Sequence, residues 1–298
     1  MRDVEGKVAF ITGGASGGGF GMAQVFLRNG MKVVIADIRQ DSLDRAMSAL
    51  GRTSDAHAIR LDVSDRAAFA RAADEAERVF GKVHVVCNNA GVIVFLPIEE
   101  CTYNEWDWIM GVNFFGVVNG CHTFIPRIRK HGEGGHIVNT ASMAAYLASG
   151  SAGIYTAAKF GVLGLSEALR FSLYRYNIGV SVFCPGMIKS AIYQSEKARP
   201  AALASENVAK AEQMAERIGQ VYKWGMEPVE VGEKVLAGIR RNDMHIFSHP
   251  EFKDELREVF EETLAAMPDG EAPPQRLDFE IGRRERLRKE KTEARQIG

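Results

Sequence analysis

The chain has 298 residues, and 46% of them are hydrophobic, which suits one α/β domain with a full core. Its formal net charge of −1 offers no electrostatic attraction to nucleic acid or to a membrane surface, and no apolar run reaches the ~18 residues of a membrane span. The chain leads from Met1 directly into its first predicted strand, so we expect no signal peptide and a cytoplasmic protein.

The first predicted elements are a strand, a glycine-rich turn and a helix. An apolar, β-rich run at 8–12 ends in the turn 13–21, and the helical pattern that follows stops at Gly30. Glycines let the backbone approach a pyrophosphate, and a helix N-terminus presents free N–H groups to the anion. A second buried strand at 32–36 ends at Asp37, where a carboxylate that binds ribose is expected. This arrangement predicts a dinucleotide site.

The rest of the chain alternates strand and helix patterns, which is typical of a parallel sheet with helices on both faces. We predict further strands at 56–61, 83–87, 135–140 and 179–184, and helices at 65–80, 104–124, 154–174 and 228–240. The predicted fold class is therefore α/β, a Rossmann-type doubly wound parallel sheet in a single domain. Ligands of such sheets bind at the carboxyl ends of the strands, and the polar and glycine-rich segments of this chain fall there.

Tyr155 and Lys159 lie four residues apart in the predicted helix 154–174, so they share one helix face. A free phenol has a pKa of about 10 and is a poor base at neutral pH. A neighbouring ammonium favours the phenolate, so we expect Lys159 to lower the pKa of Tyr155 towards the working range of a general base. The isolated pair also fits a solvated helix face, but Ser142 and Asn113 precede it along the chain.

Together these segments resemble the short-chain dehydrogenase/reductase family over roughly residues 5–240. The matching motifs are the glycine turn at Thr12, Gly13, Gly17 and Gly19, the Asn-Asn-Ala-Gly at 88–91, the catalytic tetrad Asn113, Ser142, Tyr155 and Lys159, and the turn at Pro185 and Gly186. The chain departs from the family pattern at Gly18, where a branched apolar residue is usual, at Ser190, where Thr is usual, and in its C-terminal segment.

The resemblance implies a role for each member of the tetrad. Tyr155 would exchange a proton with the substrate oxygen while the cofactor exchanges a hydride. Lys159 would also bind the ribose, Ser142 would hydrogen-bond the substrate oxygen, and Asn113 would bind a water through its main chain. The cofactor-binding residues that the resemblance implies are Gly13, Ser16, Gly17, Gly19, Phe20, Asp37, Ile38, Asp62, Val63, Asn89, Ala90, Gly91, Tyr155, Lys159, Pro185, Gly186, Ile188 and Ser190.

Asp37 favours NAD as the cofactor. A carboxylate can accept hydrogen bonds from both ribose hydroxyls of NAD, and it repels the 2′-phosphate of NADP. NADP-dependent members of the family tend to carry Arg or Lys beside this position or inside the glycine turn. Here Ile38 follows Asp37, the turn contains no basic residue, and Arg39 is the only nearby cation.

The residues beside the tetrad are apolar or aromatic, which suits a bulky hydrophobic secondary alcohol or ketone, although each of them could equally belong to the core. They include Val92 to Phe95, Met143 to Leu147, Met187, Ile188, Ile192, Tyr193 and Trp224. The helix-forming segment at 191–225 is long for a connection, so we expect a mobile lid there. We divide the chain into a dinucleotide-binding and catalytic domain at 1–245 and a C-terminal helical extension with a charged tail at 246–298.

The extension begins with an amphipathic helix predicted at 250–267, whose apolar stripe contains Phe252, Leu256, Val259, Phe260 and Leu264. We expect this stripe to pack near the lid or across a subunit boundary, and the charged run at 278–295 to form an exposed or fraying helix of little importance. The long lid and extended ending resemble the Cα-dehydrogenases of lignin-derived β-aryl ethers. Family resemblance also implies a homodimer or homotetramer in which the helices starting near Asn104 and Ile154 pair.

Other classes of function have less support in the sequence. His245 and His249 are joined by no Cys or carboxylate cluster, so we expect no metal site. The four cysteines show no paired spacing, and Cys87 and Cys184 fall in predicted strands, as buried thiols do in a reducing compartment. An NAD-binding sensor or scaffold without activity would be marked by a missing tetrad residue. A nucleotide-sugar epimerase or dehydratase usually has a larger C-terminal domain.

Overall fold

The computed structural model describes residues 1–51 and 53–297, so residue 298 of the predicted extension lies outside the described residues. Its centre is a sheet of seven parallel strands in the order β3-β2-β1-β4-β5-β6-β7. The predicted Rossmann-type fold is confirmed. The strands are β1 (Val8–Thr12), β2 (Lys32–Asp37), β3 (Ala56–Arg60), β4 (Val85–Asn88), β5 (Gly135–Thr140), β6 (Ile178–Cys184) and β7 (His245–Phe247).

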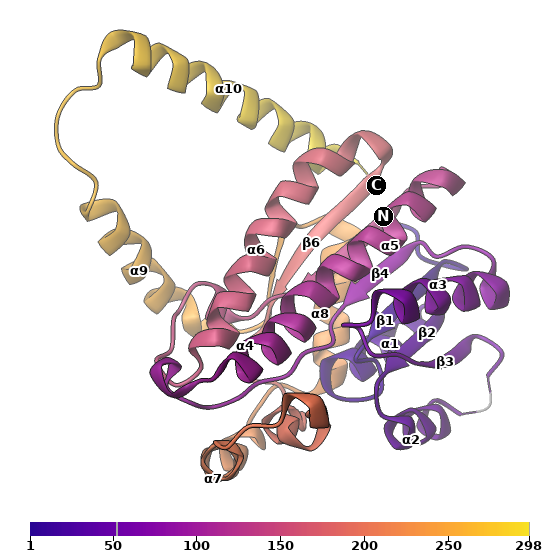
Figure 1. The fold of residues 1–298 in the computed structure, drawn as a ribbon. Coiled ribbons are helices and arrows are strands. Elements are labelled where there is room, and N and C mark those ends of the chain that lie inside the picture. The colour runs from indigo at the N-terminus through magenta and orange to yellow at the C-terminus, as the bar shows by residue number, and fades with distance from the viewer. Residues whose placement is uncertain (52, 298) are drawn as a thin grey trace.

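Helices cover both faces of the sheet, because side chains of successive strand residues point to opposite faces (Figure 1). Phe10 packs with α3 (Arg66–Phe80), α5 (Gly116–His131) and α6 (Gly153–Leu173) on one face. The next residue, Ile11, packs on the other face with a second set of helices, α1 (Gly17–Arg28), α2 (Gln40–Leu50) and α8 (Pro228–Arg241). Both faces of these strands are therefore buried, which explains their nearly continuous apolar sequence.

The strand order reverses its direction of growth between β1 and β4. The chain moves outward from β1 through β2 to β3 and then returns to place β4 on the other side of β1. At such a switch point the loops after the two neighbouring strands diverge and leave a crevice at their carboxyl ends. The glycine turn follows β1 and the segment 89–91 follows β4, so both border this crevice.

The prediction of one helix at 104–124 is wrong in two respects: the helix is interrupted, and it ends later than expected. The structure has α4 (Tyr103–Met110), one π-helical turn (Gly111–Phe115) and then α5, which continues through Pro126 to His131. Proline removes one helical hydrogen bond, but Phe124 and Ile128 on either side of it are buried in the core. The packing of Phe124 and Ile128 in the core stabilises the part of α5 that follows Pro126.

The predicted lid contains three short helical elements, η5 (Ile192–Ala198), η6 (Ala201–Leu203) and α7 (Val208–Tyr222). Figure 1 shows α7 at the edge of the molecule, below the ends of the strands. Strand β7 extends to Phe247, two residues beyond the boundary expected at 245.

The extension forms a C-terminal arm, residues 250–297, with η7 (Pro250–Phe252), α9 (Lys253–Ala265) and α10 (Pro274–Gln296). Figure 1 shows it leading away from the body beyond α9 and returning along α10 to the end of α6. Phe260 is 50% exposed and Leu264 69% exposed, so the apolar stripe is not buried within the single chain as one of our two alternatives required.

The charged run is an exposed helix, as expected, but its last turn is anchored. The carbonyl of Ala294 accepts hydrogen bonds from Asn242 Nδ2 at 2.8 Å and Arg170 Nη2 at 3.3 Å, and Tyr174 donates to Glu293 at 2.9 Å. These contacts were not expected, and they predict that the last turn of α10 contributes to stability. Of the described helices, none is long and apolar enough to cross a membrane.

Candidate active site

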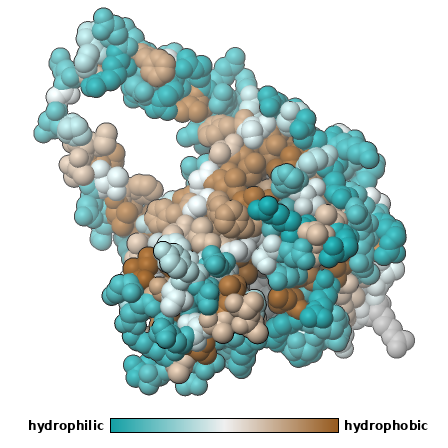
Figure 2. Space-filling model, viewed as in Figure 1, coloured by the Kyte–Doolittle hydropathy of each residue, from teal (hydrophilic) through white to brown (hydrophobic). Residues whose placement is uncertain are grey.

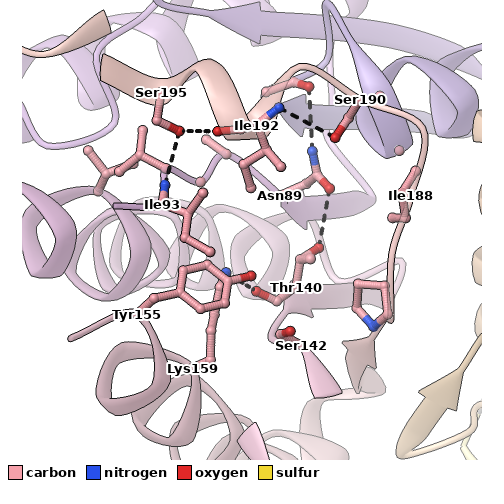
Figure 3. A pocket seen from close by; sticks show the side chains of 18 of the residues that line it. Asn89, Ile93, Thr140, Ser142, Tyr155, Lys159, Ile188, Ser190, Ile192 and Ser195 are labelled. Atoms are coloured by element: carbon pink, nitrogen blue, oxygen red, sulfur yellow. Dashed lines mark hydrogen bonds between the residues drawn. The ribbon is translucent and has the colours of Figure 1, made fainter. Parts of the chain in front are cut away.

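A cavity of about 540 Å³ lies at the carboxyl ends of the strands, between the crevice and the predicted lid. The turns after β1, β2, β4, β5 and β6 contribute to its wall, and α6 contributes Tyr155 and Lys159. Figure 3 shows these two side chains beside Ser142 and Thr140. Residues spread over more than a hundred positions of the sequence therefore meet in one space.

The glycine turn has no room for larger side chains at the positions that face the crevice. Gly13 has φ +62°, and a Cβ there would lie 2.9 Å from Ala90 Cα. Gly17 has φ +50°, and a Cβ there would lie 2.8 Å from the Ser190 side chain. Helix α1 begins at Gly17, so its free N–H groups point into the cavity. These residues fit the pyrophosphate of a dinucleotide.

Thr12 and Asn89 hold the two sides of the crevice together. Thr12 Oγ1 accepts hydrogen bonds from the backbone N–H of Asn89 at 2.9 Å and of Ala90 at 3.1 Å, and Asn89 Nδ2 donates to the Thr12 carbonyl at 3.1 Å. Thr140 donates to Asn89 Oδ1 at 3.5 Å (Figure 3). The crevice is thus fixed by polar contacts before any ligand binds.

Asp37 ends β2 at the far side of the cavity. Its carboxylate accepts a hydrogen bond from the Arg39 backbone N–H at 3.1 Å. Burial raises the pKa of Asp37, and backbone hydrogen bonds from Arg39 and Ala15 oppose that rise. The Arg39 guanidinium is paired with Asp41 at 3.2 Å, although Arg39 also borders the cavity.

The Lys159 ammonium is buried, with 2% of the residue exposed. It donates a hydrogen bond to the Thr140 carbonyl at 2.8 Å and lies 5.5 Å from the centre of the Tyr155 ring. Burial lowers the pKa of Lys159 from 10.5 to about 8. The side chain can therefore bind a polar group that enters the cavity from the cofactor side.

The pKa of Tyr155 differs from our expectation. Burial raises it, and a hydrogen bond with Ser142 opposes that rise. We expected Lys159 to lower this pKa, but the ammonium is directed at the Thr140 carbonyl, and the phenol loses more from desolvation than it gains. In the protein alone the phenol is thus a proton donor.

Asn113 lies in the π-helical turn and is fully buried. Its Oδ1 accepts from the Val92 N–H at 2.8 Å, and its Nδ2 donates to the Val92 carbonyl at 2.8 Å. A Cβ at Gly91 would lie 3.2 Å from Asn113 Oδ1 and 3.7 Å from Lys159 Nζ, so the two side chains approach the same point. The Asn113 side chain does not border the cavity, and it is engaged with Val92, so the resemblance's water-binding role could fall only to its main chain.

A model of the short chain dehydrogenase family matches residues 7–201. The chain belongs to this family. It is 41% identical over 277 residues to a C alpha-dehydrogenase of Sphingobium, which covers 92% of this chain and 91% of that relative. The resemblance to the family and to Cα-dehydrogenases is confirmed.

Two solved structures support the same assignment. A short-chain dehydrogenase from Novosphingobium aromaticivorans has a TM-score of 0.84 and 45% identity, over 98% of this chain and all of that one. A short chain dehydrogenase/reductase from Burkholderia phymatum, solved in complex with NAD, has a TM-score of 0.84 and 34% identity, over 92% of this chain and 100% of its own.

Most cofactor-binding residues expected of this short-chain dehydrogenase border the cavity, but Gly19 and Phe20 do not. Phe20 packs on the core beneath the turn instead, because it is on the inner side of α1. Several further residues border the cavity that the resemblance did not imply. Some of them end a strand or directly follow one, and this position in the sequence could have identified them. They are Leu61, Thr140 and Ala141, together with Gly18 and Arg39.

The outer part of the cavity is apolar and aromatic. Trp224, which we expected there, is 75% exposed and lies elsewhere, and Tyr193 packs on the Tyr222 ring at 5.4 Å instead. Burial raises the pKa of Tyr222, and so does the charge of a Tyr155 phenolate, so the two phenols lie near each other. The lining residues of this part are Val92, Ile93, Phe95, Trp108, Met143, Ile192, Ile218, Tyr222 and Phe252.

Three contacts join the segment predicted as a lid to the wall at this end of the cavity. Ser195 Oγ accepts from the Ile93 N–H at 3.0 Å (Figure 3), and Arg199 Nη2 lies 3.4 Å from Glu105 Oε1. The Arg199 guanidinium also lies 4.4 Å from the centre of the Trp108 ring. Both charged side chains are almost completely buried. The lid therefore contacts both the loop after β4 and helix α4.

Proposed function

We propose that this short-chain dehydrogenase uses NAD to interconvert a bulky, aromatic secondary alcohol and its ketone. The observation that carries the proposal is a single cavity with two ends. At one end the glycine turn and Asp37 suit a dinucleotide, and at the other Ser142 and Tyr155 face an apolar, aromatic wall. A bound nicotinamide supplies or accepts the hydride.

The chain's own residues handle the substrate oxygen. Ser142 donates a hydrogen bond to that oxygen and stabilises the negative charge that develops on it. In ketone reduction the Tyr155 hydroxyl gives its proton to the oxygen, as its raised pKa favours. In alcohol oxidation the Tyr155 phenolate takes the proton of the alcohol, and the Lys159 ammonium, held by its hydrogen bond to the Thr140 carbonyl, stabilises that phenolate.

Two features favour NAD over NADP. Asp37 would set a carboxylate beside the 2′-phosphate of NADP. Of the two nearby cations, Arg39 is paired with Asp41, and the Nε of Arg60 donates to the Ile38 carbonyl at 3.2 Å. The Burkholderia relative was solved with NAD bound. We infer the same cofactor for this chain.

An aromatic substrate is favoured by the outer wall. Trp108, Tyr222 and Phe252 supply ring faces and edges that suit the faces of a substrate ring. The relative from Sphingobium is named a C alpha-dehydrogenase. We propose that a benzylic secondary alcohol is the substrate, with its carbinol carbon near Tyr155 and its ring against this wall.

A panel of benzylic, alicyclic and sugar alcohols, assayed with NAD by the absorbance of NADH, tests the proposal. We expect the benzylic compounds to have the highest kcat/KM. Tyr155→Phe should lower kcat by about 100-fold or more and leave NADH affinity within about twofold, while the exposed Tyr103→Phe serves as the control. A Tyr155→Phe variant that turns over like wild type would exclude the proton-transfer role.

We further propose that the chain works as a homo-oligomer in a reducing compartment such as the cytoplasm, which suits its free cysteines. Phe115 and Phe160 are 44% and 45% exposed, and Phe260 and Leu264 of the C-terminal arm are exposed as well. Figure 2 shows apolar side chains beside the opening that the arm encloses. A second copy of the chain would cover them. Light scattering should give a dimer or tetramer that Phe160→Lys dissociates, and a monomeric wild type would disprove this.

A further inference from the structure

His249 forms hydrogen bonds with two successive residues of the turn after β6. Its Nδ1 accepts from the Gly186 N–H at 3.0 Å, and its Nε2 lies 3.0 Å from the Met187 carbonyl oxygen. Ser248 Oγ lies 2.7 Å from the same Nδ1. One imidazole therefore connects the segment after β7 to a turn that borders the cavity.

These contacts determine the tautomer of the ring. A backbone N–H can only donate and a carbonyl can only accept, so Nδ1 must be the acceptor and Nε2 must carry the proton. The Ser248 hydroxyl then donates to Nδ1 as well. His249 is thus a neutral imidazole that holds one N–H and one C=O of the turn at the same time.

The same turn is packed tightly against the C-terminal segment. A Cβ at Gly186 would lie 2.6 Å from Phe252 Cε2 and 2.9 Å from His249 Cγ, so only glycine fits there. Phe252 also borders the cavity. The root of the C-terminal arm therefore forms part of the wall next to the reacting groups, outside the matched family region.

Ile188 follows Met187 in this turn, and it forms an isolated parallel β-bridge with Met226. The Met226 N–H donates to the Met187 carbonyl at 2.9 Å, and the Lys189 N–H donates to the Met226 carbonyl at 3.0 Å. In this pairing the amide and carbonyl of Ile188 itself take no part and lie on the other side of the strand. Ile188 borders the cavity, and we infer that these two backbone groups face it.

We propose that His249 is a positioning residue for the cofactor. His249 holds the Gly186 N–H and shares the Met187 carbonyl with the Met226 N–H, and in this way it fixes the backbone just before Ile188 and directs the Ile188 amide and carbonyl at the cavity. One backbone donor and one backbone acceptor suit the carboxamide group of a nicotinamide, which has one acceptor oxygen and one donor NH₂. The inference rests on the proposed function, since it assigns the nicotinamide to this end of the cavity.

The test compares three substitutions of His249 in the full-length protein. His249→Asn keeps an acceptor near the position of Nδ1, His249→Gln keeps a donor near the position of Nε2, and His249→Ala keeps neither. The exposed His122 of α5 provides a matched control, His122→Ala. For each protein we would measure the Kd of NADH by fluorescence titration, kcat, the KM of the alcohol, and Tm.

We expect His249→Ala to weaken NADH binding about tenfold or more, on the order of one lost hydrogen bond, and to lower kcat. His249→Asn and His249→Gln should each recover part of the affinity, while His122→Ala should match wild type. The proposal is overturned if His249→Ala binds NADH like wild type. It is also overturned if all three variants lose affinity equally and in proportion to Tm, because that result would show a structural role only.

These outcomes are separate from failure of the proposed function. A wild-type protein that binds no NADH would disprove both. If the wild type binds NADH and oxidises alcohols while His249→Ala leaves the Kd of NADH unchanged, only the positioning role is disproved. If the wild type binds NADH but oxidises none of the alcohols, and His249→Ala still weakens NADH binding, the proposed reaction fails and the positioning role stands.

Discussion

The Lys159 ammonium lies 5.5 Å from the centre of the Tyr155 ring, but its hydrogen bond goes to the Thr140 carbonyl at 2.8 Å. The two side chains are therefore neighbours without being a hydrogen-bonded pair. Burial moves their pKa values in opposite directions, raising that of Tyr155 and lowering that of Lys159. Burial thus disfavours the charged form of each side chain relative to water.

The pH dependence of the reaction should follow from this pairing. Alcohol oxidation needs the Tyr155 phenolate, whose fraction rises with pH, whereas ketone reduction needs the protonated phenol, whose fraction falls. Since burial raises the pKa of Tyr155, we expect kcat for oxidation to increase from pH 7 to 10 and kcat for reduction to decrease. Initial rates in both directions over this range would check the signs. Parallel profiles for the two directions would contradict the assignment of Tyr155.

Lys159→Met should change the pH dependence of stability. The pKa of Lys159 is lowered to about 8 in the folded protein from 10.5, so between these values the unfolded chain binds more protons than the folded one. Wild-type stability should therefore rise with pH relative to Lys159→Met, by about 2 kcal/mol between pH 7 and 9.5. Urea denaturation at both pH values would measure it, with Lys130→Met, at an exposed lysine of α5, as the control. A constant difference would show that the ammonium is well solvated.

Asp37→Ala should narrow the preference for NAD over NADP. The substitution removes both an acceptor for the ribose hydroxyls and the charge that repels the 2′-phosphate. We expect the ratio of kcat/KM for NAD to kcat/KM for NADP to fall by an amount that corresponds to about 1–3 kcal/mol. Asp44→Ala, an exposed carboxylate on α2, is the matched control. A wild type that prefers NADP would show that the cofactor assignment is wrong.

Two shortened chains should separate the roles of the C-terminal arm. A chain ending at Gly270 loses α10 and the hydrogen bonds of Arg170 and Asn242 to Ala294, so we expect a lower Tm and a kcat near that of wild type. A chain ending at His249 also loses Phe252, which borders the cavity. We expect this shorter chain to have a higher KM for the alcohol than the chain ending at Gly270. Equal KM values for the two chains would exclude Phe252 from substrate binding.

The sheet and its helices could be predicted because their signals are local. Strands buried on both faces give continuous apolar runs, and amphipathic helices separate them. The π-helical turn around Asn113 could not be predicted, because five residues are too few to distinguish its period from that of an α-helix. The continuation of α5 through Pro126 depends on core packing that only the tertiary structure shows.

The site residues that could be predicted are those that lie at, or shortly after, the carboxyl end of a predicted strand. Asp37, Asn89, Ser142 and Pro185 border the cavity for this reason. The apolar stripe at 250–267 predicted burial, but Phe252, Leu256 and Val259 are only half-buried, Phe260 and Leu264 are exposed, and of the five only Phe252 borders the cavity. The contact of His249 with Gly186 joins residues 63 positions apart and has no local signal.

The two hydrogen bonds between Asn113 and Val92 fix the peptide that begins the loop after β4. That loop also contributes Ile93 and Phe95 to the outer cavity. One wall of the cavity is therefore held by Asn113, a member of the tetrad. The opposite wall comes from the predicted lid. We therefore expect substitutions of cavity-lining side chains in the predicted lid, such as Ile192 and Ile218, to change substrate preference while the reacting groups keep their positions.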